Sequence, residues 1–400
     1  MKKKQKRWVL TRHKIIVGLA KLFLIGFVKA KYGVKIEKFK EQSKRQYLIL
    51  FNHQTLFDQF LVALAFKGHT YFVASEDIFS NGFISKLLRF AVAPIPIKKQ
   101  TSDTQAVMDC ARVARQGGTI AIAPEGNRTY NGTTVYINPA IAKLAKLLKL
   151  PIAFFRIEGG YGVHPRWSDC IRKGKMRAYV SKVVEYEDIK NMPETELYEL
   201  IKTELYVNEA CDSGSFYGKA NAEYLDRLLY VCPHCGLSKF TSKGDTITCC
   251  SCGKTARYTP EKKFVGDFDF TFVNDWYTYQ EDFINNLDLT KYDLSPAFTD
   301  TASVSEVILY KHKRKIFDIA TIRLFGDKIT LNADKVCCSF SFDIISGISV
   351  LGRNKLNIYV GDKVYQFKGD KGFNAIKFVN FYHRYKNLQG GKPYGKFLGL

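Results

Sequence analysis

Short apolar runs alternate with helical patterns in the first half of the chain. Tyr47–Phe51 and Thr119–Ala123 are almost wholly apolar, and their length predicts buried β-strands. A segment with helical spacing, Gln59–Phe66, follows the first strand, and another, Asp103–Gln116, precedes the second. The second helix is expected to end at Gly117, because glycine commonly stops a helix. This part of the chain is therefore expected to alternate strands with helices.

From about Val304 onward the pattern changes to short strands separated by turn signals. Gly326-Asp327 and Gly361-Asp362 are pairs typical of hairpins, and an amphipathic helix is expected at Phe373–Lys386. Seven antiparallel strands followed by one helix resemble a pleckstrin-homology (PH) or GRAM-like domain. Such domains often bind phosphoinositides or proteins, and a packing module for the first domain is the alternative. The predicted strands are Val307–Tyr310, Thr321–Phe325, Ile329–Leu331, Val336–Phe342, Ile348–Val350, Leu356–Val360 and Val364–Phe367.

The composition indicates a folded and strongly basic protein. Apolar and aromatic residues make up 46% of the 400 residues, which excludes a wholly disordered chain. The net charge of +23 suggests an acidic partner, either nucleic acid or an anionic membrane surface. Residues 1–50 carry fifteen Lys or Arg and two Glu, so more than half of the excess lies at the N-terminus. This distribution, beside an apolar run, favours the membrane.

The apolar run in this basic segment, Ile15–Val28, is interrupted by a single charge, Lys21. No small-residue cleavage site follows it, so a signal peptide is not indicated, and no uncharged apolar stretch reaches the roughly 18 residues of a membrane-spanning helix. We expect a basic amphipathic helix that lies in a membrane interface. There are two alternatives. One is a surface helix that packs on its own domain and follows a disordered basic leader, and the other is a short re-entrant helix pair. The side chains expected at the acyl boundary are Trp8, Ile15, Leu19, Leu22, Phe23 and Phe27.

Five of the ten cysteines lie in one short segment that is typical of a zinc ribbon. Two Cys-x-x-Cys-Gly motifs are separated by thirteen residues, and four thiolates can complete a tetrahedron around Zn²⁺. The expected ligands are Cys232, Cys235, Cys249 and Cys252. A closed four-thiolate site leaves no position for a substrate, so the metal is expected to be structural. Cys250 and His234 are expected not to bind it. Thiolate ligation implies a reducing compartment, hence the cytoplasm.

His53 lies where the first predicted strand passes into a helix. Asp58 follows five residues later, and a turn before the helix can bring its carboxylate back to the imidazole. A carboxylate on one ring nitrogen fixes the tautomer and makes the other nitrogen more basic. The pair is therefore a candidate general base for deprotonating a hydroxyl group. The alternative is structural. Thr55 and Asp58 have the spacing of a capping box, so they can simply cap the helix, and His53 can be incidental.

A second candidate motif, Pro124–Thr129, follows the strand at 119–123. Arg128 can bind phosphate oxygens in a bidentate manner, and Gly126 permits close approach of the backbone. A strand that ends in such a loop suits a phosphate site. An ordinary turn with a surface arginine is the alternative.

The two motifs together resemble the glycerolipid acyltransferase family, whose best-known members are 1-acylglycerol-3-phosphate acyltransferases. The resemblance rests on His53-x-x-x-x-Asp58 and, about seventy residues later, Pro124-Glu125-Gly126-Asn127-Arg128, and covers roughly residues 10–225. Gly82–Lys99 is similar to the family's second block, and Pro151-Ile152-Ala153 is similar to its fourth.

The resemblance implies transfer of a fatty acyl group from acyl-CoA or acyl-carrier protein to the hydroxyl of lysophosphatidic acid, giving phosphatidic acid. His53 would be the general base, Asp58 would orient it, and the hydroxyl would attack the thioester without an acyl-enzyme. Arg128 would hold the phosphate of the acceptor, in a loop shaped by Glu125 and Gly126.

This chain departs from the family pattern at several positions that concern the acceptor. Lys98 and Lys99 stand where the second block usually ends in arginine, and they are candidate substrate-binding residues. Ala123, Asn127 and Thr129 also differ from the usual third block. The headgroup therefore stays open, with another lysophospholipid or glycerol 3-phosphate as alternative acceptors.

The resemblance further implies an α/β acyltransferase domain with a mixed, largely parallel sheet, flanking helices and a site at the carboxyl ends of the strands. Met176–Val183 and Glu194–Leu205 supply a later strand and helix. We expect the protein at the cytoplasmic face of a membrane, monotopic or peripheral. A nucleic-acid-binding regulator is a distant alternative, because the ribbon lacks a dense basic stripe.

The expected parts are a basic membrane-anchoring helical segment (1–45), the acyltransferase domain (46–225), the zinc ribbon (226–260), a linker with a helix (261–302) and the PH/GRAM-like domain (303–390).

Overall fold

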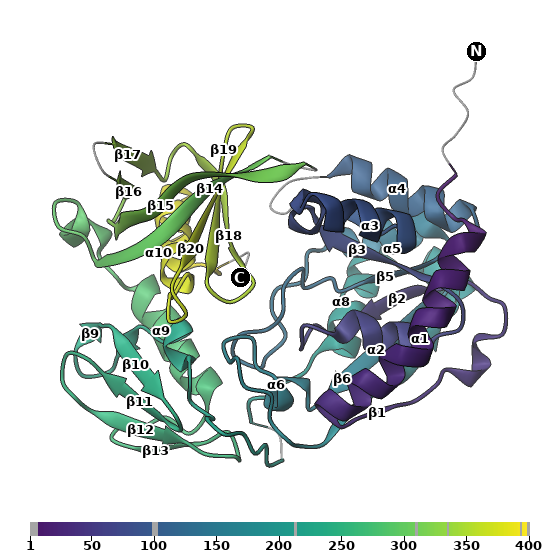
Figure 1. The fold of residues 1–400 in the computed structure, drawn as a ribbon, viewed down its shortest axis with the longest axis horizontal. Coiled ribbons are helices and arrows are strands. Elements are labelled where there is room, and N and C mark those ends of the chain that lie inside the picture. Colours follow the sequence, from purple (N-terminus) through teal and green to yellow (C-terminus); the bar gives the residue numbers. More distant parts are fainter. Residues whose placement is uncertain are drawn as a thin grey trace.

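The computed structural model describes residues 7–97, 103–211, 214–308, 311–333, 336–392 and 394–397. It consists of an α/β domain, a small ribbon and a β domain. The α/β domain lies on one side of the molecule, and the ribbon and the β domain lie together on the other (Figure 1).

A seven-stranded sheet forms the centre of the α/β domain, in the order β1-β7-β6-β2-β5-β3-β4. Neighbouring strands are parallel except for the β6–β7 pair, so the expected mixed, largely parallel sheet is confirmed. The strands are β1 (Val34–Ile36), β2 (Leu48–Phe51), β3 (Thr70–Ser75), β4 (Ile95–Ile97), β5 (Thr119–Ile122), β6 (Ile152–Glu158) and β7 (Met176–Val184).

Helices cover both faces of this sheet, which explains why β2 is apolar at every position. Leu48 and Leu50 pack in a core with α4, α5 and α8, whereas Ile49 and Phe51 pack on the other face with α1 and α2. Near-continuous apolar sequence is what a parallel strand buried on both faces requires. The helices are α1 (Thr11–Tyr32), α2 (Asp58–Ala65), α3 (Phe83–Ala91), α4 (Thr104–Arg115), α5 (Ala140–Leu148), α6 (Gly160–Val163), α7 (Tyr186–Asn191) and α8 (Glu194–Leu205).

Helix α1 packs on the domain through one face and exposes apolar side chains on the other. Val17, Val28 and Tyr32 are buried, while Leu22 and Phe23 are 71% and 80% exposed. The helix therefore packs on its own domain, and its outer face presents exposed apolar side chains; its position in a membrane interface stays a prediction. Among the described residues, no helix is both long enough and apolar enough to cross a bilayer.

Trp8 differs from the expectation that it lies at the acyl boundary. Its indole Nε1 donates a hydrogen bond to the carbonyl oxygen of Ala93 at 3.0 Å, and its side chain packs against the core beneath α4 and α5. Trp8 therefore anchors the start of α1 to the domain, and that prediction is wrong. The lysines of the expected leader, Lys2–Lys4, lie outside the described residues.

The ribbon is built from short antiparallel strands and continues into a helix. Helix α9 (Val273–Asn285) lies in the segment 261–302, where a helix was expected, and its Trp276 is fully buried among ribbon aromatics such as Phe268. The segment expected as a linker with a helix thus completes the core of the ribbon. The strands are β8 (Val231–Cys232), β9 (Gly236–Leu237), β10 (Phe240–Lys243), β11 (Thr246–Cys249), β12 (Thr255–Tyr258) and β13 (Phe264–Gly266).

The β domain has seven strands in the order β17-β16-β15-β14-β20-β19-β18 and ends in helix α10 (Ile376–Gln389). All neighbouring pairs are antiparallel, as expected. Strand β14 begins at Phe298, so the predicted strand Val307–Tyr310 meets only its last two residues, and positions 309 and 310 lie outside the described residues. Strand β15 is longer than predicted, because the charged stretch Lys313–Lys315 pairs with β14 without being buried in the core. The strands are β14 (Phe298–Ile308), β15 (His312–Leu324), β16 (Lys328–Ala333), β17 (Val336–Ser341), β18 (Ile345–Leu351), β19 (Lys355–Val360) and β20 (Lys363–Gly369).

Candidate active site

The two sequence motifs meet because their strands are parallel neighbours. Strand β2 pairs with β5, so the loops that follow the two strands leave the same edge of the sheet. The backbone N–H of Thr129 donates to the carbonyl oxygen of His53 at 3.1 Å, and the backbone N–H of His53 donates to Oε1 of Glu125 at 2.7 Å. These two bonds join the histidine loop to the arginine loop.

His53 and Asp58 form a hydrogen-bonded pair. Asp58 Oδ2 lies 2.8 Å from His53 Nδ1, and the carboxylate is fully buried while the imidazole is about one-quarter exposed. Because an ionised carboxylate only accepts hydrogen bonds, Nδ1 carries the proton and Nε2 keeps its lone pair. No residue in the described part of the chain is bonded to Nε2. The geometry therefore suits a ring that takes a proton through Nε2.

Asp58 also organises the turn that carries His53. Its oxygens accept hydrogen bonds from the backbone N–H of Gln54 (2.6 Å), the backbone N–H of Thr55 (2.9 and 3.0 Å) and the hydroxyl of Thr55 (2.6 Å). Helix α2 begins at Asp58 itself, and its first turn has no side-chain cap. Only half of the predicted capping box forms: Asp58 accepts the backbone N–H of Thr55, whereas the hydroxyl of Thr55 accepts the backbone N–H of Phe57 instead of that of Asp58.

The electrostatic environment keeps His53 neutral. Burial lowers the pKa of His53, the adjacent Asp58 carboxylate opposes this shift, and Arg128 and Arg166 lower the pKa further. Below its pKa the ring would be protonated and could not accept a proton. Since that pKa is below the ordinary value, the basic form persists to mildly acidic pH.

Glu125 organises the loop, and both of its oxygens are occupied. One accepts from the backbone N–H of His53, and the other accepts from the backbone N–H of Val135 at 3.2 Å. Burial raises the pKa of Glu125 to about 8. The next residue, Gly126, has φ of +70°, a left-handed conformation that glycine adopts without strain. Both residues therefore shape the arginine loop.

Arg128 is the buried cation of the site. Its side chain is only 7% exposed, and its Nη1 has no hydrogen-bond partner among the described residues. Burial lowers the pKa of Arg128 to about 9, and the nearby Arg166 adds to this shift. A buried guanidinium with an unused N–H group is suited to an anionic ligand, since a charge-assisted bond would offset its desolvation.

Lys98 and Lys99, the other expected substrate-binding residues, lie outside the described residues. The structure adds three residues that the sequence analysis missed. The hydroxyl of Tyr32 lies 3.1 Å from Nδ1 of His164, and Arg166 Nη1 donates to the carbonyl oxygen of Arg128 at 3.0 Å. They come from separate segments without a recognisable motif, so only the fold brings them together.

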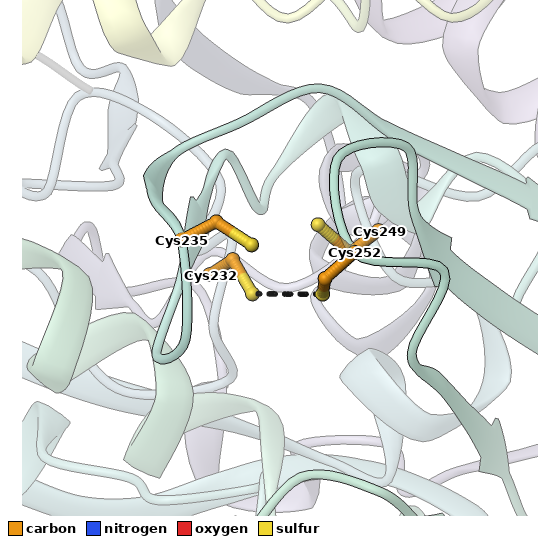
Figure 2. Close-up of side chains that lie close together, drawn as sticks. All are labelled: Cys232, Cys235, Cys249 and Cys252. Carbon is orange, nitrogen blue, oxygen red and sulfur yellow. Dashed lines mark hydrogen bonds between the residues drawn. The ribbon is translucent and has the colours of Figure 1, made fainter.

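The four predicted zinc ligands are clustered in the ribbon, and their side chains point toward one another (Figure 2). Their sulfur atoms all lie within 4.8 Å of one another, and Cys232 Sγ is 3.9 Å from Cys252 Sγ. A tetrahedron with Zn–S bonds of about 2.3 Å has edges of about 3.8 Å, so the cluster fits this ion. Cys250 is exposed and lies outside the cluster, as expected.

The fold and the site define an α/β enzyme domain with a His–Asp pair and a buried arginine at the carboxyl ends of parallel strands. Residues 33–157 match the family model described as Acyltransferase, and this match spans both motifs. The α/β domain is therefore a domain of the acyltransferase family, and acyl transfer is its general activity.

Two solved structures give weaker likenesses. The 1-acyl-sn-glycerophosphate (LPA) acyltransferase PlsC from Thermotoga maritima is 19% identical, with a TM-score of 0.42 over 48% of this chain and 77% of that chain. The N-terminal PH domain of human ARAP2 is 14% identical, with a TM-score of 0.18 over 24% of this chain and 85% of that chain. At these TM-scores neither likeness defines an activity for this chain. No curated protein matches the chain.

Proposed function

We propose that the protein transfers a fatty acyl group from acyl-CoA or acyl-carrier protein to the hydroxyl of lysophosphatidic acid, producing phosphatidic acid for phospholipid biosynthesis. One observation carries the proposal: a histidine with a free Nε2 lies in a loop that is bonded directly to the loop of a buried arginine with an unused N–H group. The first group suits deprotonation of a hydroxyl, and the second suits a phosphate on the same substrate.

The proposed reaction needs no covalent enzyme intermediate. Nε2 of His53 accepts the proton of the acceptor hydroxyl as its oxygen attacks the carbonyl carbon of the thioester. Asp58 stabilises the imidazolium that forms. The tetrahedral intermediate then collapses with cleavage of the C–S bond, and the departing thiolate receives the proton from His53. The products are the ester and the free thiol.

The test is an acyl-transfer assay on the full chain in lipid, with both thioester donors and several acceptors. We expect transfer to lysophosphatidic acid and its loss in His53→Ala, with the fold unchanged by circular dichroism. If transfer to another lysophospholipid or to glycerol 3-phosphate is faster, that compound is the acceptor in place of lysophosphatidic acid. Full activity of His53→Ala would refute the assignment of the base.

We also propose that the protein binds the cytoplasmic face of an anionic membrane through α1 and α3. The two helices contact each other, with Arg12 of α1 lying 4.3 Å from the centre of the Phe90 ring of α3. Exposed apolar side chains beside lysines and arginines are the pattern of a helix that lies in a bilayer interface. The exposed apolar residues are Ile15, Leu19, Leu22, Phe23 and Phe27 on α1, and Phe83, Ile84, Leu87 and Phe90 on α3.

The cysteine cluster is proposed to hold one structural Zn²⁺. Four thiolates would fill its coordination sphere, so the metal would stabilise the ribbon and take no part in acyl transfer. Cys232 and Cys249 are fully buried in the core that the ribbon shares with the β domain. Metal binding would therefore stabilise more of the C-terminal half than the ribbon alone.

A further inference from the structure

A turn of the C-terminal β domain reaches the candidate active site. The turn joins β18 to β19 and contains Gly352, Arg353 and Asn354. Arg166 of the α/β domain donates from Nε to the carbonyl oxygen of Gly352 at 3.0 Å and from Nη2 to that of Val350 at 2.9 Å. Its third nitrogen bonds the carbonyl oxygen of Arg128. One guanidinium, only 2% exposed, therefore holds the turn and the arginine loop together.

The side chain of Arg353 is oriented by two residues of the α/β domain. Nη1 donates to Oδ1 of Asp169 at 2.8 Å, and Nη2 lies 2.6 Å from Nε2 of His164. Because arginine can only donate, Nε2 of His164 is the acceptor and Nδ1 carries the proton toward the hydroxyl of Tyr32. Tyr32 accepts that bond, so its own hydroxyl hydrogen remains available.

Arg166 bonds the backbone of both the Arg128 loop and the turn that carries Arg353, and each of these two arginines has an unused donor. Nε of Arg353 and Nη1 of Arg128 are buried and lack a hydrogen-bond partner among the described residues. Burial lowers the pKa of Arg128, and the charge of Arg353 adds to this shift. Burial and the charge of Asp58 raise the pKa of Tyr32, and the two arginines offset only part of that rise.

The carboxylates near these arginines are already committed. Asp58 is bonded to His53, and Asp169 is shared between Arg353 and Arg227. Three guanidinium groups, those of Arg128, Arg166 and Arg353, thus gather where a phosphate dianion would relieve their mutual repulsion.

We propose that Arg353 is a second phosphate-binding residue of the acyl-acceptor site, supplied to the α/β domain by the β domain. The inference rests on the proposed function for the identity of the ligand, a lipid with a phosphomonoester. Arg353 and Arg128 bind its phosphate from two sides, and Arg166 fixes the spacing between them. The acceptor site is complete only when the β domain is docked.

The test compares four variants of the full chain with the wild type. Arg353→Gln removes the cation, and Arg353→Lys keeps the charge without the fork of donors. Asp169→Asn removes the charge of the carboxylate that pairs with Arg353 and Arg227 and so weakens the domain contact, but it keeps the guanidinium of Arg353. Lys363→Gln removes an exposed positive charge at the start of β20 and controls for net charge. Binding of short-chain lysophosphatidic acid is measured by calorimetry, and kcat and KM are measured for acceptor and thioester separately.

We expect Arg353→Gln to weaken acceptor binding by about ten- to hundredfold, the loss of a charge-assisted hydrogen bond, with the KM for the thioester unchanged. Arg353→Lys should lie between it and the wild type, and Lys363→Gln should match the wild type. Monoacylglycerol, which lacks the phosphate, should be used equally by wild type and Arg353→Gln.

Unchanged acceptor binding in Arg353→Gln would overturn the inference. The inference would also be overturned if Asp169→Asn and Arg353→Gln raised the KM values for acceptor and thioester by equal factors. Arg353 would then only help to dock the two domains. Phosphate-dependent binding without acyl transfer in the wild type would refute the proposed function and leave the role of Arg353 intact. Acyl transfer to lysophosphatidic acid that is unchanged in Arg353→Gln would support the proposed function and refute the role of Arg353.

Discussion

Replacing Asp58 by asparagine separates the charge of the carboxylate from its shape. Oδ2 accepts three N–H groups, from His53, Gln54 and Thr55, at 2.6–2.9 Å. An amide NH₂ cannot occupy that position, because it would face only donors. At the position of Oδ1 it would lose the bond from the backbone N–H of Thr55 at 3.0 Å, but that N–H still reaches Oδ2, and the hydroxyl of Thr55 can turn and accept from the amide. One orientation of asparagine therefore preserves the turn and the bond to Nδ1 of His53.

The expected loss is one of rate. When His53 takes the proton, wild-type Asp58 faces an imidazolium with charge centres about 4 Å apart, worth about 4 kcal/mol at an effective dielectric constant of 20. The neutral amide keeps only part of this stabilisation. We expect kcat to fall by about 10²- to 10³-fold, since each 1.36 kcal/mol is about tenfold in rate.

The assay follows release of free thiol from the acyl thioester, with acceptor at saturation. Thermal unfolding shows whether Asp58→Asn is folded, and the double variant with His53→Ala tests whether the two side chains act as a unit. The double variant should be no slower than His53→Ala alone. A folded Asp58→Asn variant with wild-type kcat, or additive losses in the double variant, would refute the orienting role of Asp58.

Three further predictions concern pH, metal and membrane. Because burial lowers the pKa of His53 and the neutral ring is the active form, kcat/KM should be constant at neutral pH and fall only below about pH 6.5; a decline that begins above pH 7 would contradict it. Elemental analysis should find one zinc per chain, lost in Cys235→Ser and kept in Cys250→Ser, and equal zinc in both variants would argue against the four-thiolate site. Phe23→Ser should reduce cosedimentation with anionic vesicles about tenfold or more, whereas Leu147→Ser, an exposed apolar control on α5, should not; equal effects would refute docking through α1.

The sequence predicts best those features whose residues are close together in the chain. His53 and Asp58 are separated by one turn, and the ribbon cysteines form two short motifs, so local spacing is enough to bring them together. Strands β2 and β5 were also predictable, because burial on both faces of the central sheet leaves apolar runs with sharp ends, whereas β1 and β3 were not predicted. Strand ends were less certain where charged residues pair without being buried, as at the start of β15.

The remaining part of the site depends on the tertiary fold. Arg353 is 225 residues beyond Arg128 in the chain, and nothing in the sequence around it differs from an ordinary hairpin turn. Trp8 was misassigned for the same reason. Beside an exposed apolar helix a tryptophan fits a membrane interface, and only the position of Ala93 reveals its hydrogen bond. Pattern identifies which residues can do chemistry, and packing between distant segments decides which of them do.

The shared core of the ribbon and the β domain links the metal to the proposed acceptor site. One cluster of buried residues runs from Cys232 and Trp276 in the ribbon to Val350 in β18, the strand that carries the turn of Arg353. The same cluster includes Trp167 of the α/β domain, whose carbonyl oxygen accepts a bond from Arg227. Loss of the metal should therefore loosen the support of Arg353 while leaving His53 and Asp58, which are held within the α/β domain, unaffected. Chelation should then raise the KM for the phosphate-bearing acceptor more than the KM for the thioester, a difference that would not arise if the ribbon only tethered an independent domain.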